Sequence, residues 1–102
     1  MEDVQLEAVM GLIMNSGEAK SLSMEAIAAA KSGNFDLADE KLSLAQEALL
    51  TAHHSQTALL TQEARGEEVP LTLLAVHSQD HLMTSITFLD LAREIVDLYR
   101  SR

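Results

Sequence analysis

Cysteine is absent from the chain, proline occurs once, at Pro70, and the aromatic side chains are limited to two phenylalanines and one tyrosine. The lack of cysteine excludes disulfides, thiolate zinc sites and cysteine nucleophiles, and it is compatible with a reducing compartment, so we expect a cytoplasmic protein. No apolar stretch approaches the roughly 20 residues that span a bilayer, and no basic segment precedes an N-terminal apolar run. We therefore expect a soluble chain without direct membrane insertion.

Basic residues are also scarce. Seven Lys and Arg stand against 16 Asp and Glu, which gives a formal net charge of −9. Binding to phosphate backbones needs a basic surface, so this balance argues against a nucleic-acid partner. It argues equally against binding to acidic membranes.

Residues with high helix propensity, mainly Ala, Leu, Glu and Met, are plentiful in the 102-residue chain and predict an all-α protein. Gly33 and Asn34 form a candidate helix-to-helix turn, and Pro70 suits a first-turn position because its missing N–H needs no partner there. These signals predict helices over about residues 2–32, 34–65 and 70–100. We expect a single domain, 1–102, that folds as an antiparallel up-down-up three-helix bundle.

The expected second helix carries an unbroken alternation of three- and four-residue steps, which is typical of a helix packed against near-parallel partners. Gln56 is the one polar residue of this seam, and His53 precedes it by about one turn. We predict that both are core residues satisfied by hydrogen bonds, and we place His54 with them as a packing or interface residue. The seam consists of Phe35, Ala38, Leu42, Ala45, Leu49, Ala52, Gln56 and Leu59.

Gly17 lies in the middle of the expected first helix. A glycine inside a helix lowers its stability by about 1 kcal/mol relative to alanine, so its presence there needs a reason. It predicts either close helix packing or a cleft.

The expected third helix carries more apolar surface than a three-helix bundle needs. One stripe consists of Leu74, His81, Ser85, Phe88, Ala92, Ile95 and Tyr99. A second stripe follows heptad spacing and consists of Leu73, Val76, Asp80, Met83, Thr87 and Asp90. We expect the second stripe to pack against copies of the same chain.

Asp80 is a polar residue within that second stripe. Three Asp80 carboxylates on a symmetry axis would repel one another, and a cation would relieve the repulsion. Oxygen-only ligation suits a hard divalent ion such as magnesium, completed by waters or by amides such as that of Gln79. The alternative is an exposed Asp80 on an ordinary polar face.

Two imidazoles, those of His77 and His81, stand four residues apart and therefore on one helical surface. Three interpretations stay open on the residues alone. The pattern His-x-x-Asp-His is similar to the His-x-x-Glu-His of inverted metalloproteases and could bind a metal. A neutral imidazole could instead carry a phosphoryl group, with the second imidazole orienting it. Both histidines could also be ordinary surface or core residues.

The sequence resembles the lactose/cellobiose-type enzyme IIA components, including the chitobiose type, of the bacterial phosphoenolpyruvate:sugar phosphotransferase system. Three segments carry the resemblance: 16–26 (SGEAKSLSMEA), 52–60 (AHHSQTALL) and 76–84 (VHSQDHLMT). Two departures are small. Lys20 stands where many relatives have arginine, and Ser78 where alanine is common.

The resemblance implies a homotrimer in which His77 is the phosphorylated residue and Asp80 binds a metal ion on the trimer axis. By its oxygen ligands we expect this ion to be magnesium. We assign Gln79 and His81 to support of the phosphoryl site and expect no organic cofactor. His77 would accept the phosphoryl group from the phosphorylated histidine carrier protein. It would donate the group to a cysteine of the enzyme IIB component during uptake of a β-linked disaccharide of the lactose/cellobiose/chitobiose class.

Two other classes compete with this interpretation. The chain could be a non-catalytic structural or regulatory helical oligomer, or a His-x-x-Asp-His metal-binding protein. The histidine phosphotransfer domains of two-component signalling fit less well, because they usually show His-x-x-Lys-Gly, whereas His77 is followed by Ser-Gln-Asp.

Overall fold

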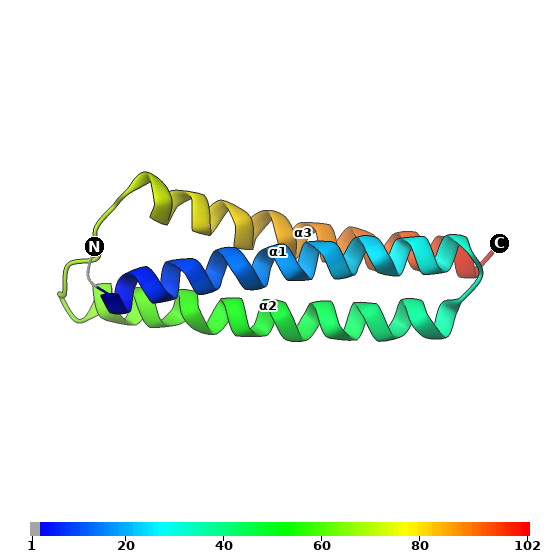
Figure 1. Cartoon of the computed structure of the whole chain (residues 1–102), viewed down its shortest axis with the longest axis horizontal. Helices are drawn as coiled ribbons and strands as arrows, with labels where there is room; N and C mark the ends of the chain where they lie inside the picture. The colour runs from blue at the N-terminus through cyan, green and yellow to red at the C-terminus, as the bar shows by residue number, and fades with distance from the viewer. Residues whose placement is uncertain (1–2) are drawn as a thin grey trace.

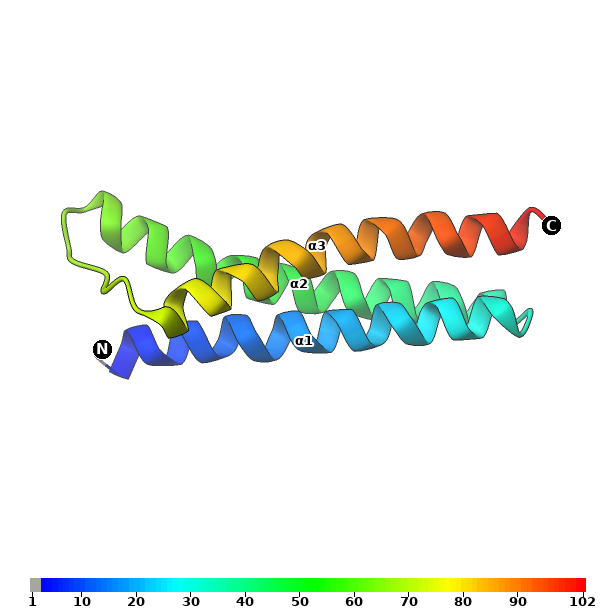
Figure 2. The same cartoon turned by 90° about the horizontal axis from the view of Figure 1, so that it is seen from above.

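The computed structural model describes residues 3–102, which form three helices and no strand (Figure 1): α1 spans Asp3–Lys31, α2 Phe35–Ala64 and α3 Leu73–Arg100. The helices run up, down and up in an elongated bundle of 52 × 19 × 19 Å, so that α1 and α3 are parallel (Figure 2). The predicted all-α, antiparallel three-helix fold is confirmed. The expected first residue of the first helix, position 2, lies outside the described residues.

The turn between α1 and α2 is built from Gly33 and Asn34, as the sequence predicts. Gly33 has a positive φ of 79°, a left-handed conformation that glycine adopts without steric penalty. The side chain of Asn34 caps α2 by accepting a hydrogen bond from the backbone N–H of Leu37 at 3.2 Å. The short turn places α2 antiparallel to α1.

The third helix begins later than predicted. Pro70 does not lie in its first turn, because α3 starts at Leu73 with Thr72 as its N-cap. The hydroxyl of Thr72 accepts a hydrogen bond from the backbone N–H of Ala75 at 3.0 Å, which satisfies a donor that has no partner inside the helix. The side-chain cap, rather than the proline, therefore fixes the start of α3.

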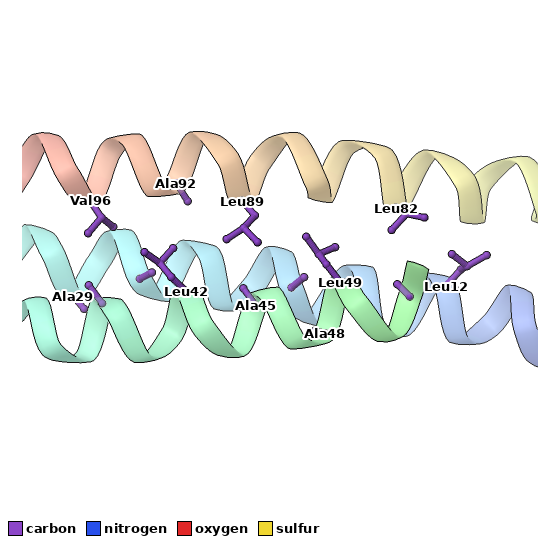
Figure 3. Packing of buried hydrophobic residues seen from close by; sticks show 14 of the residues in the cluster. Leu12, Ala29, Leu42, Ala45, Ala48, Leu49, Leu82, Leu89, Ala92 and Val96 are labelled. Atoms are coloured by element: carbon purple, nitrogen blue, oxygen red, sulfur yellow. The ribbon is translucent and has the colours of Figure 1, made fainter. Parts of the chain in front are cut away.

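The core lies where the three helices meet, and Figure 3 shows leucines and alanines of all three helices within it. Leu12, Leu42, Leu49, Leu82 and Leu89 are each at most 7% exposed. Each buried leucine contributes about 1.5–3 kcal/mol, while the alanines let the helix backbones approach closely. The predicted seam of α2 is confirmed at its six apolar positions from 38 to 59, whereas its end residue Phe35 and its polar residue Gln56 are half-buried.

The predicted core stripe of α3 is confirmed at Ser85 and Ala92 and wrong at its other positions. The buried residues are Ser78, Leu82, Ser85, Leu89, Ala92 and Val96, whereas the predicted Leu74 is exposed and His81, Phe88, Ile95 and Tyr99 are half-buried. The helix packs against α1 and α2 at once, so the line of its surface that points between them becomes the core. Leu82, Leu89 and Val96, spaced by seven residues, lie on that line.

Two further expectations are corrected. Gly17 makes no close helix contact, since a Cβ built on it would meet no described atom within 4 Å. His53 is exposed on α2 and is not a core residue. Gln56, by contrast, is half-buried and hydrogen-bonded, as predicted for it.

Within residues 3–102, every helix falls short of the length of apolar sequence that crossing a membrane requires.

Candidate functional site

His77 and His81 of α3 form a pair on the surface of the bundle. Their Nε2 atoms lie 3.1 Å apart, and the two rings meet edge to face with centroids 4.5 Å apart and an interplanar angle of 87°. At this distance the two nitrogens form a hydrogen bond, in which one ring donates its N–H and the other accepts with a lone pair. The ring of His77 is exposed to solvent, while His81 is half-buried.

Backbone contacts hold the turn that carries the pair. Ser78 is fully buried and donates its hydroxyl to the carbonyl of Ala75 at 2.6 Å, and Thr84 donates to the carbonyl of Asp80 at 2.7 Å. One turn beyond His81, the hydroxyl of Ser85 donates to the backbone carbonyl of Ser16 at 2.9 Å, which ties α3 to α1. The histidines therefore stand on a helix segment that is fixed against α1.

The surface around the pair has an unusual composition for an acidic chain. We call it the α1–α3 face and define it by a set of exposed and half-buried residues on the flank of each helix away from α2. None of them is Asp or Glu, although the chain has 16, and the one cation among them is Lys20, while Asp3 and Lys31 continue the line of Met10 and Met24 beyond the two ends of the face. Its residues are Leu6, Met10, Ile13, Met14, Gly17, Lys20, Ser21, Met24 and Ile27 of α1 and Leu74, His77, His81, Thr84, Phe88, Leu91 and Ile95 of α3.

The structure does not bring Gln79 together with the two histidines within one chain. Gln79 lies on the flank of α3 that faces α2, where its Oε1 accepts a hydrogen bond from Nε2 of Gln56 at 2.7 Å. Two residues along a helix correspond to a rotation of about 200°, so the side chain of Gln79 points to nearly the opposite side from those of His77 and His81. This contact between α2 and α3 is one that the sequence did not predict.

Asp80 follows His77 by three residues, about 60° around the helix, and faces solvent beside it. Its neighbours on the outer face of α3 are exposed and apolar: Leu73, Val76 and Met83 are 86%, 42% and 55% exposed. Within residues 3–102 of one chain, no three His, Asp or Glu side chains gather closely enough to hold a metal ion. One chain thus supplies a single carboxylate at this point.

A groove adjoins Asp80 between the end of α2 and the start of α3. Its volume is about 360 Å³, and apolar side chains of α2 and of the preceding linker make up much of its lining. No sequence pattern predicted this groove, because it depends on the delayed start of α3. It is lined by Leu59, Leu60, Glu63, Val69, Pro70, Leu71, Ala75, Val76, Gln79 and Asp80.

The arrangement can perform nucleophilic chemistry at one imidazole. A neutral, exposed imidazole nitrogen can attack an electrophile such as phosphorus, and a second imidazole within hydrogen-bond distance can orient the attached group. The absence of carboxylates from the α1–α3 face, within the described residues, removes repulsion that would oppose an anion there.

Comparisons with known proteins point in the same direction. A family model described as "PTS system, Lactose/Cellobiose specific IIA subunit" matches residues 7–100. The lichenan-specific phosphotransferase enzyme IIA component of Bacillus subtilis (strain 168) is 48% identical over 99 residues, which cover 97% of this chain and 90% of that protein.

Solved structures also match over nearly the whole chain. The cellobiose-specific enzyme IIA from Bacillus anthracis superposes with a TM-score of 0.94 at 46% identity, covering 99% of this chain and 93% of the other. The IIA(chitobiose) structure determined in complex with HPr, from the Escherichia coli phosphotransferase system, gives a TM-score of 0.83 at 39% identity, covering 99% and 97%.

Proposed function

Because the chain belongs to the lactose/cellobiose-specific IIA family of the sugar phosphotransferase system, and is therefore a phosphotransferase component, we propose that His77 carries its phosphoryl group. The observation that supports this most directly is the exposed imidazole of His77, held 3.1 Å from a second imidazole on a face without carboxylates. A lone pair on a ring nitrogen of His77 attacks phosphorus, and the phosphorus–nitrogen bond of the donor histidine breaks. The electron pair of that bond returns to the donor ring.

The donor is the phosphorylated histidine carrier protein. A relative at 39% identity was solved in complex with HPr, the carrier of this kind, which supports the same partner for this chain. A phosphoryl group brings about two negative charges, so the carboxylate-free α1–α3 face is where it can approach with least repulsion. The exposed Met10, Met14 and Met24 add adaptable apolar contact area beside the path of approach.

The acceptor is a cysteine of the enzyme IIB component. Its thiolate attacks phosphorus, the bond to His77 breaks, and the electron pair returns to the imidazole ring. Both transfers need alignment and charge stabilisation more than further covalent chemistry from the host, which a rigid helix can provide. Cellobiose and chitobiose, which appear in the names of two relatives, support a role in the uptake of a β-linked disaccharide. The relay operates in the cytoplasm.

His81 supports the phosphoryl group on His77. Its Nε2 lies at hydrogen-bond distance from His77 Nε2 and can donate to a phosphoryl oxygen once the group is attached. Gln79 of the same chain faces α2 instead, so any contact it makes with a phosphoryl group comes from a neighbouring copy.

The chain assembles as a homotrimer through the outer face of α3. That face exposes Val76 and Met83 beside the apolar groove at the start of the helix, a combination that is buried when copies pack together. Asp80 lies in the middle of this surface, with no hydrogen bond or ion pair of its carboxylate to any described residue. The trimer would bring three such carboxylates to one axis.

A divalent cation fits these carboxylates. Three oxygen ligands of like charge suit a hard ion, and magnesium accepts such ligands together with water. The ion would offset the mutual repulsion of the Asp80 side chains and thereby hold the trimer together. Phosphoryl transfer at His77 involves no step at this ion.

Phosphorylation tests the role of His77. The intact protein is incubated with phosphoenolpyruvate and the general phosphotransfer proteins, and its mass is measured. We expect an acid-labile gain of one phosphoryl group, absent in His77→Ala and retained in His54→Ala, a control at another exposed histidine. No gain in the unmodified protein would favour a purely structural oligomer.

The mass in solution tests the role of Asp80. In Asp80→Lys we expect the mass to fall below that of a trimer, because three added positive charges cannot share the axis. Glu18→Lys, the same charge change at an exposed position of α1, serves as the control and should leave the trimer intact. Removal of divalent cations by a chelator should weaken the unmodified trimer in the same assay.

A further inference from the structure

Two buried polar atoms lack a hydrogen-bond partner in the part of the chain that the structure describes: Oγ of Ser16 and Nδ1 of His81. Buried polar groups in folded proteins are almost always paired, because desolvation without a partner is unfavourable. One of these atoms belongs to the histidine pair and the other does not. The coincidence calls for an explanation at the site.

Ser16 differs from the other buried serines. Ser23, seven residues after Ser16 on α1, donates its hydroxyl to the carbonyl of Ala19 at 2.8 Å. Ser78 and Ser85 of α3 also donate to backbone carbonyls. Ser16 is 0% exposed like them, yet its hydroxyl makes no such bond.

The contact between α1 and α3 places Ser16 close to His81. Ser85 donates to the carbonyl of Ser16, and His81 precedes Ser85 by one helical turn. Side chains lean toward the N-terminus of their helix, whereas carbonyls point toward the C-terminus. Since α1 and α3 run parallel, the hydroxyl of Ser16 therefore extends from the Ser85 contact toward the level of His81.

We propose that the hydroxyl of Ser16 donates through one ordered water to Nδ1 of His81, and so positions the histidine pair for transfer. The direction follows from the proposed role of His81: its Nε2 carries the ring proton in order to donate to a phosphoryl oxygen, so Nδ1 of the neutral ring accepts. A water that accepts from the hydroxyl of Ser16 and donates to Nδ1 then satisfies both orphaned atoms.

The consequence is a fixed tautomer of His81. With Nδ1 as acceptor, the proton of the neutral ring resides on Nε2, the atom that faces Nε2 of His77. His81 then presents a donor to the phosphoryl group without needing to rotate or exchange its proton. Ser16 touches no reacting atom, so it is a positioning residue, and this inference rests on the proposed role of His77.

The tautomer of His81 can be observed directly by ¹⁵N NMR of the histidine-labelled, intact protein. In the unmodified protein we expect the Nε2–H form of His81 to predominate. In Ser16→Ala we expect its population to fall. Ser23→Ala removes an equally buried serine hydroxyl from the same helix and should leave the His81 spectrum unchanged.

Transfer kinetics provide the second readout. In Ser16→Ala we expect kcat for phosphorylation by the donor carrier to fall about fivefold, the factor that one net hydrogen bond supplies at 25 °C. KM for the donor should stay constant, because the docking surface is unchanged. In a His81→Gln background, Ser16→Ala should lower the rate no further, since its effect passes through His81.

A Ser16→Ala protein whose His81 spectrum and kcat both match those of Ser23→Ala would overturn the inference. An equal loss of rate from Ser16→Ala in the unmodified and the His81→Gln backgrounds would overturn it as well. Neither result touches the proposed function, which fails separately if His77→Ala still becomes phosphorylated.

Discussion

At the scale of the residue, one turn of α3 distributes four polar side chains to four environments. Ser78 is buried, Gln79 faces α2, Asp80 faces solvent, and His77 lies on the α1–α3 face. The cause is the rotation of about 100° per residue in an α-helix, which separates sequence neighbours and joins residues four apart. A candidate catalytic pair and a candidate assembly residue can therefore occupy neighbouring positions of one turn.

The hydrogen bond between Gln56 and Gln79 is expected to contribute to stability. Gln56→Ala removes the donor and leaves the half-buried amide of Gln79 without its partner, which should lower the free energy of unfolding by about 1 kcal/mol. Denaturant titration measures the change. Gln46→Ala removes a hydrogen bond with Arg93 between exposed side chains, so its effect should be smaller.

At the scale of the element, α3 has one side that is buried in the core and another whose apolar side chains are exposed. Its buried line of Leu82, Leu89 and Val96 completes the core, while its outer face leaves apolar side chains in solvent. A helix that is apolar on more than one side signals an additional partner, because a surface helix of a globular protein needs only one such stripe. This is why α3 supports the proposal of assembly.

Adjacent residues of α3 should separate folding from assembly. Leu82→Ala leaves a cavity in the core and should lower the free energy of unfolding by about 2–5 kcal/mol. Met83→Ala removes a side chain that is 55% exposed in one chain, and should leave the fold of the subunit intact while weakening the trimer. Thermal unfolding and mass in solution, measured across protein concentrations, distinguish the two effects.

The N-cap of α3 offers a second test at this scale. Thr72→Ala removes the acceptor for the N–H of Ala75 and should destabilise the protein by about 1 kcal/mol. Thr72→Ser keeps a capping hydroxyl and should retain most of the stability. If Pro70 rather than Thr72 set the helix start, Thr72→Ala would have no measurable effect.

At the scale of the whole molecule, the bundle separates its charges. None of the residues that define the α1–α3 face is an Asp or Glu, and Asp3 lies just beyond its end on α1. At the far end of the bundle, Arg100 bonds to Asp39 and lies over the ring of Phe35, which joins the end of α3 to the start of α2. The hydrogen bond to Asp39 raises the pKa of Arg100, so this cation is retained throughout the pH range in which the protein works.

Charge reversal on the α1–α3 face should impair docking of the donor. Lys20→Glu places a carboxylate where the phosphoryl group approaches, and should raise KM for the phosphorylated carrier roughly 2- to 10-fold at low salt. The effect should shrink as ionic strength rises, because salt screens exposed charges. Arg65→Glu, at the exposed end of α2, is the matched charge control and should leave KM nearly unchanged.

The sequence by itself determined the helical class, the topology, the turn at Gly33 and Asn34, and the pairing of His77 with His81. Each of these rests on local propensity or on spacing along one helix, which is set before any tertiary contact forms. The family resemblance, carried by segments from all three helices, was also readable from the chain alone.

Only the tertiary structure decided which line of α3 is buried, because that depends on packing against two helices at once and the heptad pattern fits more than one register. It also decided that Gln79 faces Gln56, that Thr72 begins α3, and that Ser16 lies near the level of His81. These relations join residues distant in the chain. No periodicity within a single segment encodes them.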